Sequence, residues 1–213
     1  PVTTIGGGVV AEAMAPKRKK LVGGEHDELR EMIDGMPTEA LAAVLRVQSW
    51  TGVPTREIPI RIGASPLESR GAKEEVLENG AREAGDDVFG AMTVERARTL
   101  IEDTVDAIHR DEPLRRGISV ELLRQTVPTS GESRLADLLL SEAVDAGALE
   151  VRDGMVCRPG YEPSLSARQS EVKEALLDTY RSAGLAPPPV SELPKALLTG
   201  PDLWPLLKLL ERE

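Results

Sequence analysis

Apolar residues recur every three or four positions in the stretch that begins at residue 93, a pattern typical of an amphipathic helix. The apolar stripe consists of Val94, Ala97, Ile101, Val105 and Ile108. A short helix over residues 119–123, capped by Ser119, and a third helix over residues 130–146 are expected to follow. The pattern therefore predicts three consecutive helices.

A tight hairpin is predicted after the third of these helices. Leu149 and Val151 alternate along one strand, and Val156 is expected to return on the same face. Asp153-Gly154 lies between the strands and is a favoured two-residue turn. Three helices followed by a hairpin are the plan of a winged-helix module, which we assign to residues 93–160.

The same order of elements is expected earlier in the chain, over residues 25–92. A helix starts at Met36, a short element covers residues 55–62, and Ser65 caps a third helix. A poor hairpin with Gly85-Asp86 as its turn follows. We interpret this stretch as a first, degenerate winged helix.

Residues 165–213 start the pattern once more and form a third, truncated winged helix. Helices are expected over residues 166–183 and 191–198, and from Gly200 through Trp204, which we expect to anchor the core. The unit thus recurs at an interval of about seventy residues, with little identity between the copies.

Residues 1–22 differ from the rest. Two β-branched runs flank Gly6-Gly7-Gly8, which indicates a strand, a kink and a second strand. A phosphate-binding loop would need Gly-Lys-Ser/Thr at its end, whereas Val9-Val10 follow here, so no cofactor is expected. Pro1 is an unusual first residue, and we expect the chain to be a segment of a longer protein.

Composition narrows the class of protein. Aromatic residues make up 2% of the chain, so aliphatic side chains must build the cores. The single cysteine, Cys157, excludes an internal disulfide and a cysteine-based zinc site, and it fits a cytoplasmic protein. No apolar stretch approaches the ~20 residues that span a bilayer, so no membrane partner is expected.

The net charge of −10 means that any contact with RNA or DNA must come from a local patch. Two groups of basic residues are candidates for RNA binding. The first group lies near the N-terminus and comprises Lys17, Arg18, Lys19 and Lys20. The second lies in the module over residues 93–160 and comprises Arg115, Arg116, Arg124 and Arg134.

Each group also has a simpler interpretation. The N-terminal cluster either contacts tRNA phosphates or is the solvated end of a domain. The four arginines are better explained as ordinary surface charge, because no aromatic residue is interleaved to stack on a base. No catalytic or metal-binding constellation is present, and His109 is expected near a helix end, where a cation is favourable.

Three phrases, in order, resemble the C-terminal half of the bacterial selenocysteine-specific elongation factor family, SelB. The first is Thr4 to Val10 followed by Pro16-Lys17-Arg18-Lys19, which is similar to the close of that family's last β-barrel. The second runs from His109 to Ile118 and resembles the connection between the first two helices of a winged-helix repeat. The third, Pro159-Gly160-Tyr161 and the residues up to Gln169, resembles the entry into the next repeat.

The resemblance implies a fold class that is mainly α with small β-hairpins (α+β): tandem winged helices preceded by the remnant of a β-barrel over residues 1–22. It implies a non-enzymatic, monomeric arm that tethers a GTPase and its selenocysteinyl-tRNA to an mRNA hairpin at the ribosome for UGA recoding. GTP and Mg²⁺ would bind a domain outside this chain, and the mRNA hairpin would bind a later module. A winged-helix DNA-binding regulator and a protein-interaction scaffold stay open as alternatives.

Overall fold

The computed structural model describes residues 6–8, 10, 13–14, 25–129, 134–165, 167–184, 186, 188–193 and 203–210. Contacts divide the chain into two units, Pro1–Glu102 with Leu123–Glu142, and Asp103–Leu122 with Ala143–Glu213. Most of residues 1–22 lies outside the described residues. The barrel remnant therefore stays a prediction.

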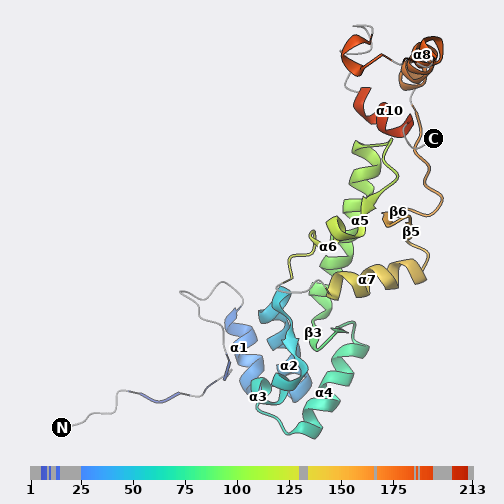
Figure 1. Cartoon of the computed structure of the whole chain (residues 1–213). Coiled ribbons are helices and arrows are strands. Elements are labelled where there is room, and N and C mark those ends of the chain that lie inside the picture. Colours follow the sequence, from blue (N-terminus) through green and yellow to red (C-terminus); the bar gives the residue numbers. More distant parts are fainter. Residues whose placement is uncertain are drawn as a thin grey trace. The chain divides into compact units, whose positions relative to one another are not determined.

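The first module begins with helices that pack around one central helix, α2. Its helices are α1 (Glu25–Asp34), α2 (Pro37–Gln48), α3 (Ile58–Ile62) and α4 (Pro66–Glu78). Helix α2 packs on the other three helices (Figure 1). It can do so because a continuous apolar face, which includes Leu41, Val44 and Leu45, is buried. Two 3₁₀ turns, η1 (Ser49–Thr51) and η2 (Thr55–Glu57), lie between α2 and α3.

A three-stranded antiparallel sheet completes the first module. Its strands β1 (Val53–Pro54), β2 (Arg82–Ala84) and β3 (Asp87–Phe89) lie in the order β1-β3-β2. Val53 pairs with Val88 at its centre, and both side chains are fully buried. Although its sequence pattern is degenerate, this module therefore has a wing, with Gly85-Asp86 as the turn between β2 and β3.

The second module repeats this order. Its elements are α5 (Ala91–Asp111), β4 (Ile118–Ser119), α6 (Val120–Arg124), α7 (Arg134–Asp145), β5 (Glu150–Arg152) and β6 (Met155–Cys157). The strands lie in the order β4-β6-β5, and Ile118 pairs with Val156 just as Val53 pairs with Val88. Four of the five stripe residues on α5 are buried, which confirms the predicted amphipathic helix; Ile108 is partly exposed.

Two details of the second module differ from the prediction. Ser119 caps α6 as predicted, with its hydroxyl 3.3 Å from the amide nitrogen of Leu122, but it ends a strand instead of starting the helix. Helix α7 is described from Arg134, and the predicted start of this helix, at residues 130–133, lies outside the described residues. Val151 is 44% exposed even though it pairs with the buried Val156. It lies on the outer strand of the sheet, whereas β6 has a neighbour on both sides.

The third module contains α8 (Ala167–Ala183), the 3₁₀ turn η3 (Val190–Glu192) and α10 (Leu203–Leu210). Its core consists of Leu176, Leu193, Leu203 and Leu206. The helix predicted over residues 191–198 overlaps η3, and residues 194–200 lie outside the described part. Trp204 is 64% exposed, so its predicted role as a core anchor is wrong. Leucines on the opposite side of α10 fill the core instead.

The predicted fold class is confirmed as helical modules with small antiparallel sheets, which is the winged-helix plan. Among the described residues, no helix is both long and apolar enough to cross a membrane.

The start of α4 provides a test of local stability. The amide nitrogen of Glu68 lies 3.3 Å from the Ser65 hydroxyl, and the Glu68 carboxylate accepts from the Ser65 amide at 2.9 Å, which is a capping box. We expect Ser65→Ala to lower the free energy of unfolding by about 1 kcal/mol in urea titrations followed by circular dichroism. Ser141→Ala, at an exposed position inside α7, is the control and should not destabilise the chain. Equal effects of the two substitutions would contradict the capping role.

Candidate functional site

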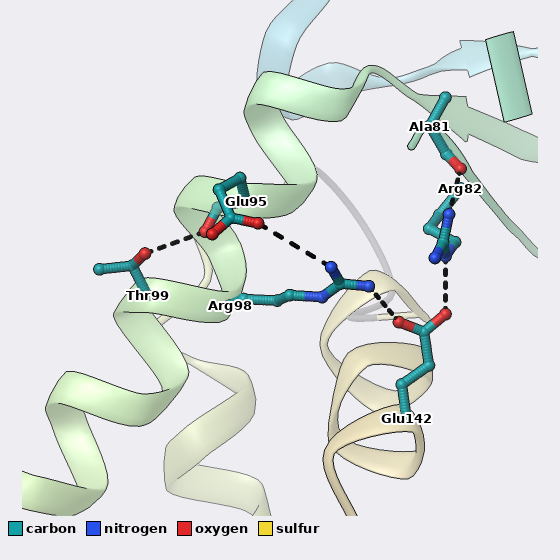
Figure 2. Close-up of polar contacts among 6 residues, drawn as sticks. All are labelled: Ala81, Arg82, Glu95, Arg98, Thr99 and Glu142. Carbon is teal, nitrogen blue, oxygen red and sulfur yellow. Dashed lines mark hydrogen bonds and ion pairs between the residues drawn. The ribbon is translucent and has the colours of Figure 1, made fainter. Parts of the chain in front are cut away.

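The wing of the first module is joined to the third helix of the second module through one carboxylate. Arg82 on β2 donates from Nε to Oε1 of Glu142 on α7 at 2.7 Å. Arg98 on α5 donates to the other oxygen, Oε2, at 2.5 Å. Figure 2 shows the two guanidinium groups approaching Glu142 from two different elements. Glu142 is therefore shared between the first wing and the first helix of its own module.

This carboxylate is held in its charged form. Burial raises the pKa of Glu142, but the hydrogen bonds and charges of Arg82 and Arg98 outweigh that effect and leave the pKa below its usual range. The three side chains are each about one third exposed, at 32% for Arg82 and Glu142 and 37% for Arg98. An ion pair at this depth is less screened by salt than one at the open surface.

Further contacts orient the two arginines. Arg82 also donates to the carbonyl oxygen of Ala81 at 2.8 Å, which fixes its guanidinium beside its own strand. Arg98 lies 3.9 Å from the carboxylate of Glu95 one turn earlier in α5. Each arginine thus has a second contact, on its own element, besides its contact with Glu142.

A second contact joins the same two elements at the turn of the first wing. Gly85 has a φ of +65°, and the Arg134 side chain at the start of α7 lies where a Cβ atom on Gly85 would be. A side chain at position 85 would therefore collide with the Cδ and guanidinium of Arg134. Glycine is favoured here by its backbone conformation, and a side chain at this position would also require the Arg134 side chain to move.

Winged helices that bind nucleic acid commonly use the third helix and the wing. In the described residues of this chain, α7 and the first wing contact each other. The wing contributes Arg82 and Gly85, and α7 contributes Glu142 and Arg134. The arrangement thus forms a contact between modules, which we call the wing–helix joint.

The predicted RNA-binding arginines of the second module are individually placed beside other groups. Arg115 lies 3.3 Å from the Glu112 carboxylate, and Arg116 lies 4.0 Å from that of Asp153. Arg124 on α6 donates to Asp137 on α7 at 2.6 Å. Arg134 packs over Gly85, as described above. The basic cluster Lys17–Lys20 lies outside the described residues, so its role stays a prediction.

The charge balance of this module agrees with that placement. Residues 93–160 contain nine arginines and thirteen acidic residues, with no lysine. Because most of the predicted arginines lie within reach of a carboxylate, they do not form a patch of unbalanced positive charge. The interpretation of these arginines as surface charge is the one that this geometry favours.

The sequence predicts a positively charged His109, whereas the structure favours its neutral form. His109 lies in the last turn of α5, as predicted, but burial lowers its pKa and so favours the neutral imidazole over the cation. Cys157 is buried, and burial together with Glu150 raises the pKa of its thiol, which keeps it protonated and unreactive. No group of three or more potential metal ligands occurs among the described residues.

The ion-pair residues of the wing–helix joint are not predictable from the sequence pattern and were missed there. Arg82 and Arg98 are separated from Glu142 by 60 and 44 positions, so no local pattern pairs them. The sequence did mark Gly85 as part of a turn and Arg134 as an RNA-binding candidate, but it did not show that they are neighbours.

The successive helical modules, of which the first two each have a small antiparallel sheet, define the class of the protein as tandem winged-helix. Residues 103–156 match the family model described as elongation factor SelB, winged helix. The chain is also 25% identical over its whole length to the selenocysteine-specific elongation factor of Desulfomicrobium baculatum. It spans about a third of that protein's length, 34%. The resemblance to SelB is confirmed, and the residues that match the SelB winged-helix model lie within the second module.

The wing–helix joint predicts a measurable coupling between its members. We expect Glu142→Gln to lower the free energy of unfolding by about 1 kcal/mol, because two guanidinium groups lose their shared partner. A double-mutant cycle with Arg82→Gln should give a coupling energy of about 0.5–1 kcal/mol. Asp103→Asn, which removes the same charge from an exposed position on α5, is the control.

The same cycle has a pH dependence. Because the folded-state pKa of Glu142 is lowered, its contribution is present above the ordinary carboxyl pKa and is lost as the pH falls through the folded value. The difference between Glu142→Gln and the original chain should therefore shrink in acid. A difference that stays constant with pH would show that the carboxylate charge is not involved.

Gly85 and Gly154 form a matched pair for testing the packing of Arg134. Both have positive φ, at +65° and +73°, but a side chain at Gly154 would meet open space. Gly154→Ala should cost about 1–2 kcal/mol through its backbone alone. Gly85→Ala should cost more, and Arg134→Ala should remove the excess. Equal destabilisation by the two glycine substitutions in urea unfolding would argue against a close contact of α7 with the first wing.

Proposed function

We propose that this chain is the part of a selenocysteine-specific elongation factor that serves as a spacer within its winged-helix arm. The factor would work in the cytoplasm, where the arm tethers a GTPase and its selenocysteinyl-tRNA to an mRNA hairpin near a UGA codon. GTP and Mg²⁺ would be bound by a domain outside this chain. On this proposal the chain itself carries out no catalysis.

The observation that carries the spacer proposal is the wing–helix joint. The first wing and α7 would be the natural surfaces for nucleic acid, yet Arg82, Arg134 and Glu142 engage them with each other. A module whose binding elements are used internally is suited to hold its neighbours at a set separation. The match of residues 103–156 to SelB supports the same role.

Tethering acts through effective concentration. Anchoring one end of an arm near the codon raises the local concentration of whatever the other end carries, without any new contact at the codon. The gain depends on the reach of the arm, and it is greatest when that reach matches the span between the sites. An acidic spacer fits this role, because a net charge of −10 disfavours adhesion to ribosomal RNA along its length.

The winged-helix DNA-binding regulator is the main alternative. It would require a basic third helix, whereas the described part of α7 carries Asp137, Glu142 and Asp145 against Arg134. Duplex DNA would meet this acidic face and be repelled. A protein-interaction scaffold would bind no nucleic acid at any salt concentration, so a titration against nucleic acids separates it from the spacer.

Fluorescence anisotropy with labelled nucleic acids tests the proposal. We expect the chain to bind a selenocysteine-insertion mRNA hairpin and duplex DNA poorly, and to bind selenocysteine tRNA weakly and in a salt-sensitive way. Replacing Lys17, Arg18, Lys19 and Lys20 with glutamine should reduce the log–log salt slope of tRNA binding by roughly 0.7–0.9 for each phosphate that is no longer neutralised. Arg115→Gln with Arg116→Gln is the matched control and should leave that slope unchanged.

Tight, sequence-selective binding to DNA would overturn the elongation-factor proposal in favour of a regulator. Tight binding to the mRNA hairpin would contradict the spacer role and would mean that this chain contains an mRNA-binding surface. Absence of tRNA binding at low salt would favour the scaffold.

A further inference from the structure

Two sequence phrases that the spacer role does not by itself explain meet in the structure. These are residues 109–118, which begin in the last turn of α5, and residues 159–165, before α8. The ring of Tyr161 stacks on the imidazole of His109, with centroids 3.5 Å apart and an interplanar angle of 4°. The Tyr161 hydroxyl donates to the carbonyl oxygen of Pro113 at 3.0 Å. One side chain of the linker thus contacts both the end of α5 and the loop that follows it.

Arg158, the first residue of the linker, is also held to α5. Arg158 forms a two-pronged pair with Asp106 on α5, at 2.8 Å from Nε and 2.7 Å from Nη2. It also donates to the carbonyl oxygen of Ala148 at 3.2 Å. The Arg158 guanidinium holds the pKa of Asp106 below its usual range, so the pair is ionised at neutral pH. Tyr161 follows Arg158 by three positions in the linker. It contacts His109, which lies about one helical turn after Asp106 on α5.

The far end of the linker is fixed by apolar contacts. Leu165, just before α8, and Leu114, in the loop after α5, both pack against the core of the third module. That core includes Leu176 and Leu206, which are fully buried. The loop of the second module and the linker therefore converge on the third module instead of running freely between two domains.

We propose that Asp106, His109, Arg158 and Tyr161 form a clasp that fixes the direction in which the third module leaves the second, with Tyr161 as the positioning residue. The proposal rests on the spacer function, because a spacer with a rigid connection has a defined reach. A free linker over residues 158–165 would instead spread its ends over roughly 15 Å. With the clasp closed, the two ends of the linker are held at one separation and in one orientation.

His109 supplies a local signal of the closed clasp. The groups that act on it are Asp106 from α5, and Arg158 and Tyr161 from the linker. Its Nε2 atom is buried without a hydrogen-bond partner, which disfavours protonation. Opening the clasp would hydrate this atom and return the pKa of His109 toward its ordinary value.

Pulsed electron spin resonance on the whole chain tests the clasp. Spin labels at Asp103→Cys on α5 and Glu174→Cys on α8 occupy exposed positions, and Cys157→Ala removes the buried native thiol. We expect a narrow distance distribution in this background. Tyr161→Ala should broaden it toward the roughly 15 Å spread of a free linker. Glu162→Ala, at the exposed neighbouring position, is the control and should leave the distribution narrow.

A second readout separates positioning from general loss of structure. Tyr161→Ala should raise the pKa of His109 in an NMR titration, whereas Tyr161→Phe keeps the ring stack and should leave that pKa low. If Tyr161→Ala lowered the helix content measured by circular dichroism, Asp106→Asn would provide the same distance comparison by breaking the arginine pair instead.

The proposal is overturned by a distribution that is broad before any substitution, or that stays narrow when the clasp residues are changed. No nucleic acid is present in this experiment. A failure of the spacer function in the anisotropy measurements would therefore leave the distance result interpretable by itself.

Discussion

The sharing of Glu142 between two arginines is the polar interaction that joins α7 both to the first wing and to α5. A partly buried carboxylate is stable when more than one donor compensates its missing hydration, and Arg82 and Arg98 supply those donors from two different elements. Because neither arginine comes from α7, the helix is held to the first wing and to α5 at once. Replacing the Glu142 carboxylate with a neutral group would leave the positive charges of Arg82 and Arg98 close together with no negative charge to balance them.

Much of the fold could be predicted from the sequence. The stripe along α5, the cap at Ser65 and the turns at Gly85-Asp86 and Asp153-Gly154 are local signals, since each depends on residues a few positions apart. The repeated element order followed from them, and it predicted a poor hairpin where the structure has the wing of the first module. The resemblance to SelB then fitted this order to a known architecture.

The rest depends on neighbours that a local pattern cannot name. Trp204 is large and apolar, but the face of α10 that meets the third core is set by Leu203 and Leu206, so the indole points elsewhere. Periodicity places Val151 on the face of Val156 but says nothing about what covers an outer strand. The partners of Glu142 and Tyr161 lie tens of residues away, and their pairing is a property of the folded chain.

The two wings differ in one respect that has a practical consequence. The tip of the first wing is closed by Arg134, whereas the tip of the second, at Asp153-Gly154, faces open space, and the Asp153 side chain is 88% exposed. Exposed loop tips with small or polar residues are the sites at which proteins best accept inserted sequence. The second wing is therefore the place to graft an affinity epitope or a fluorescent reporter.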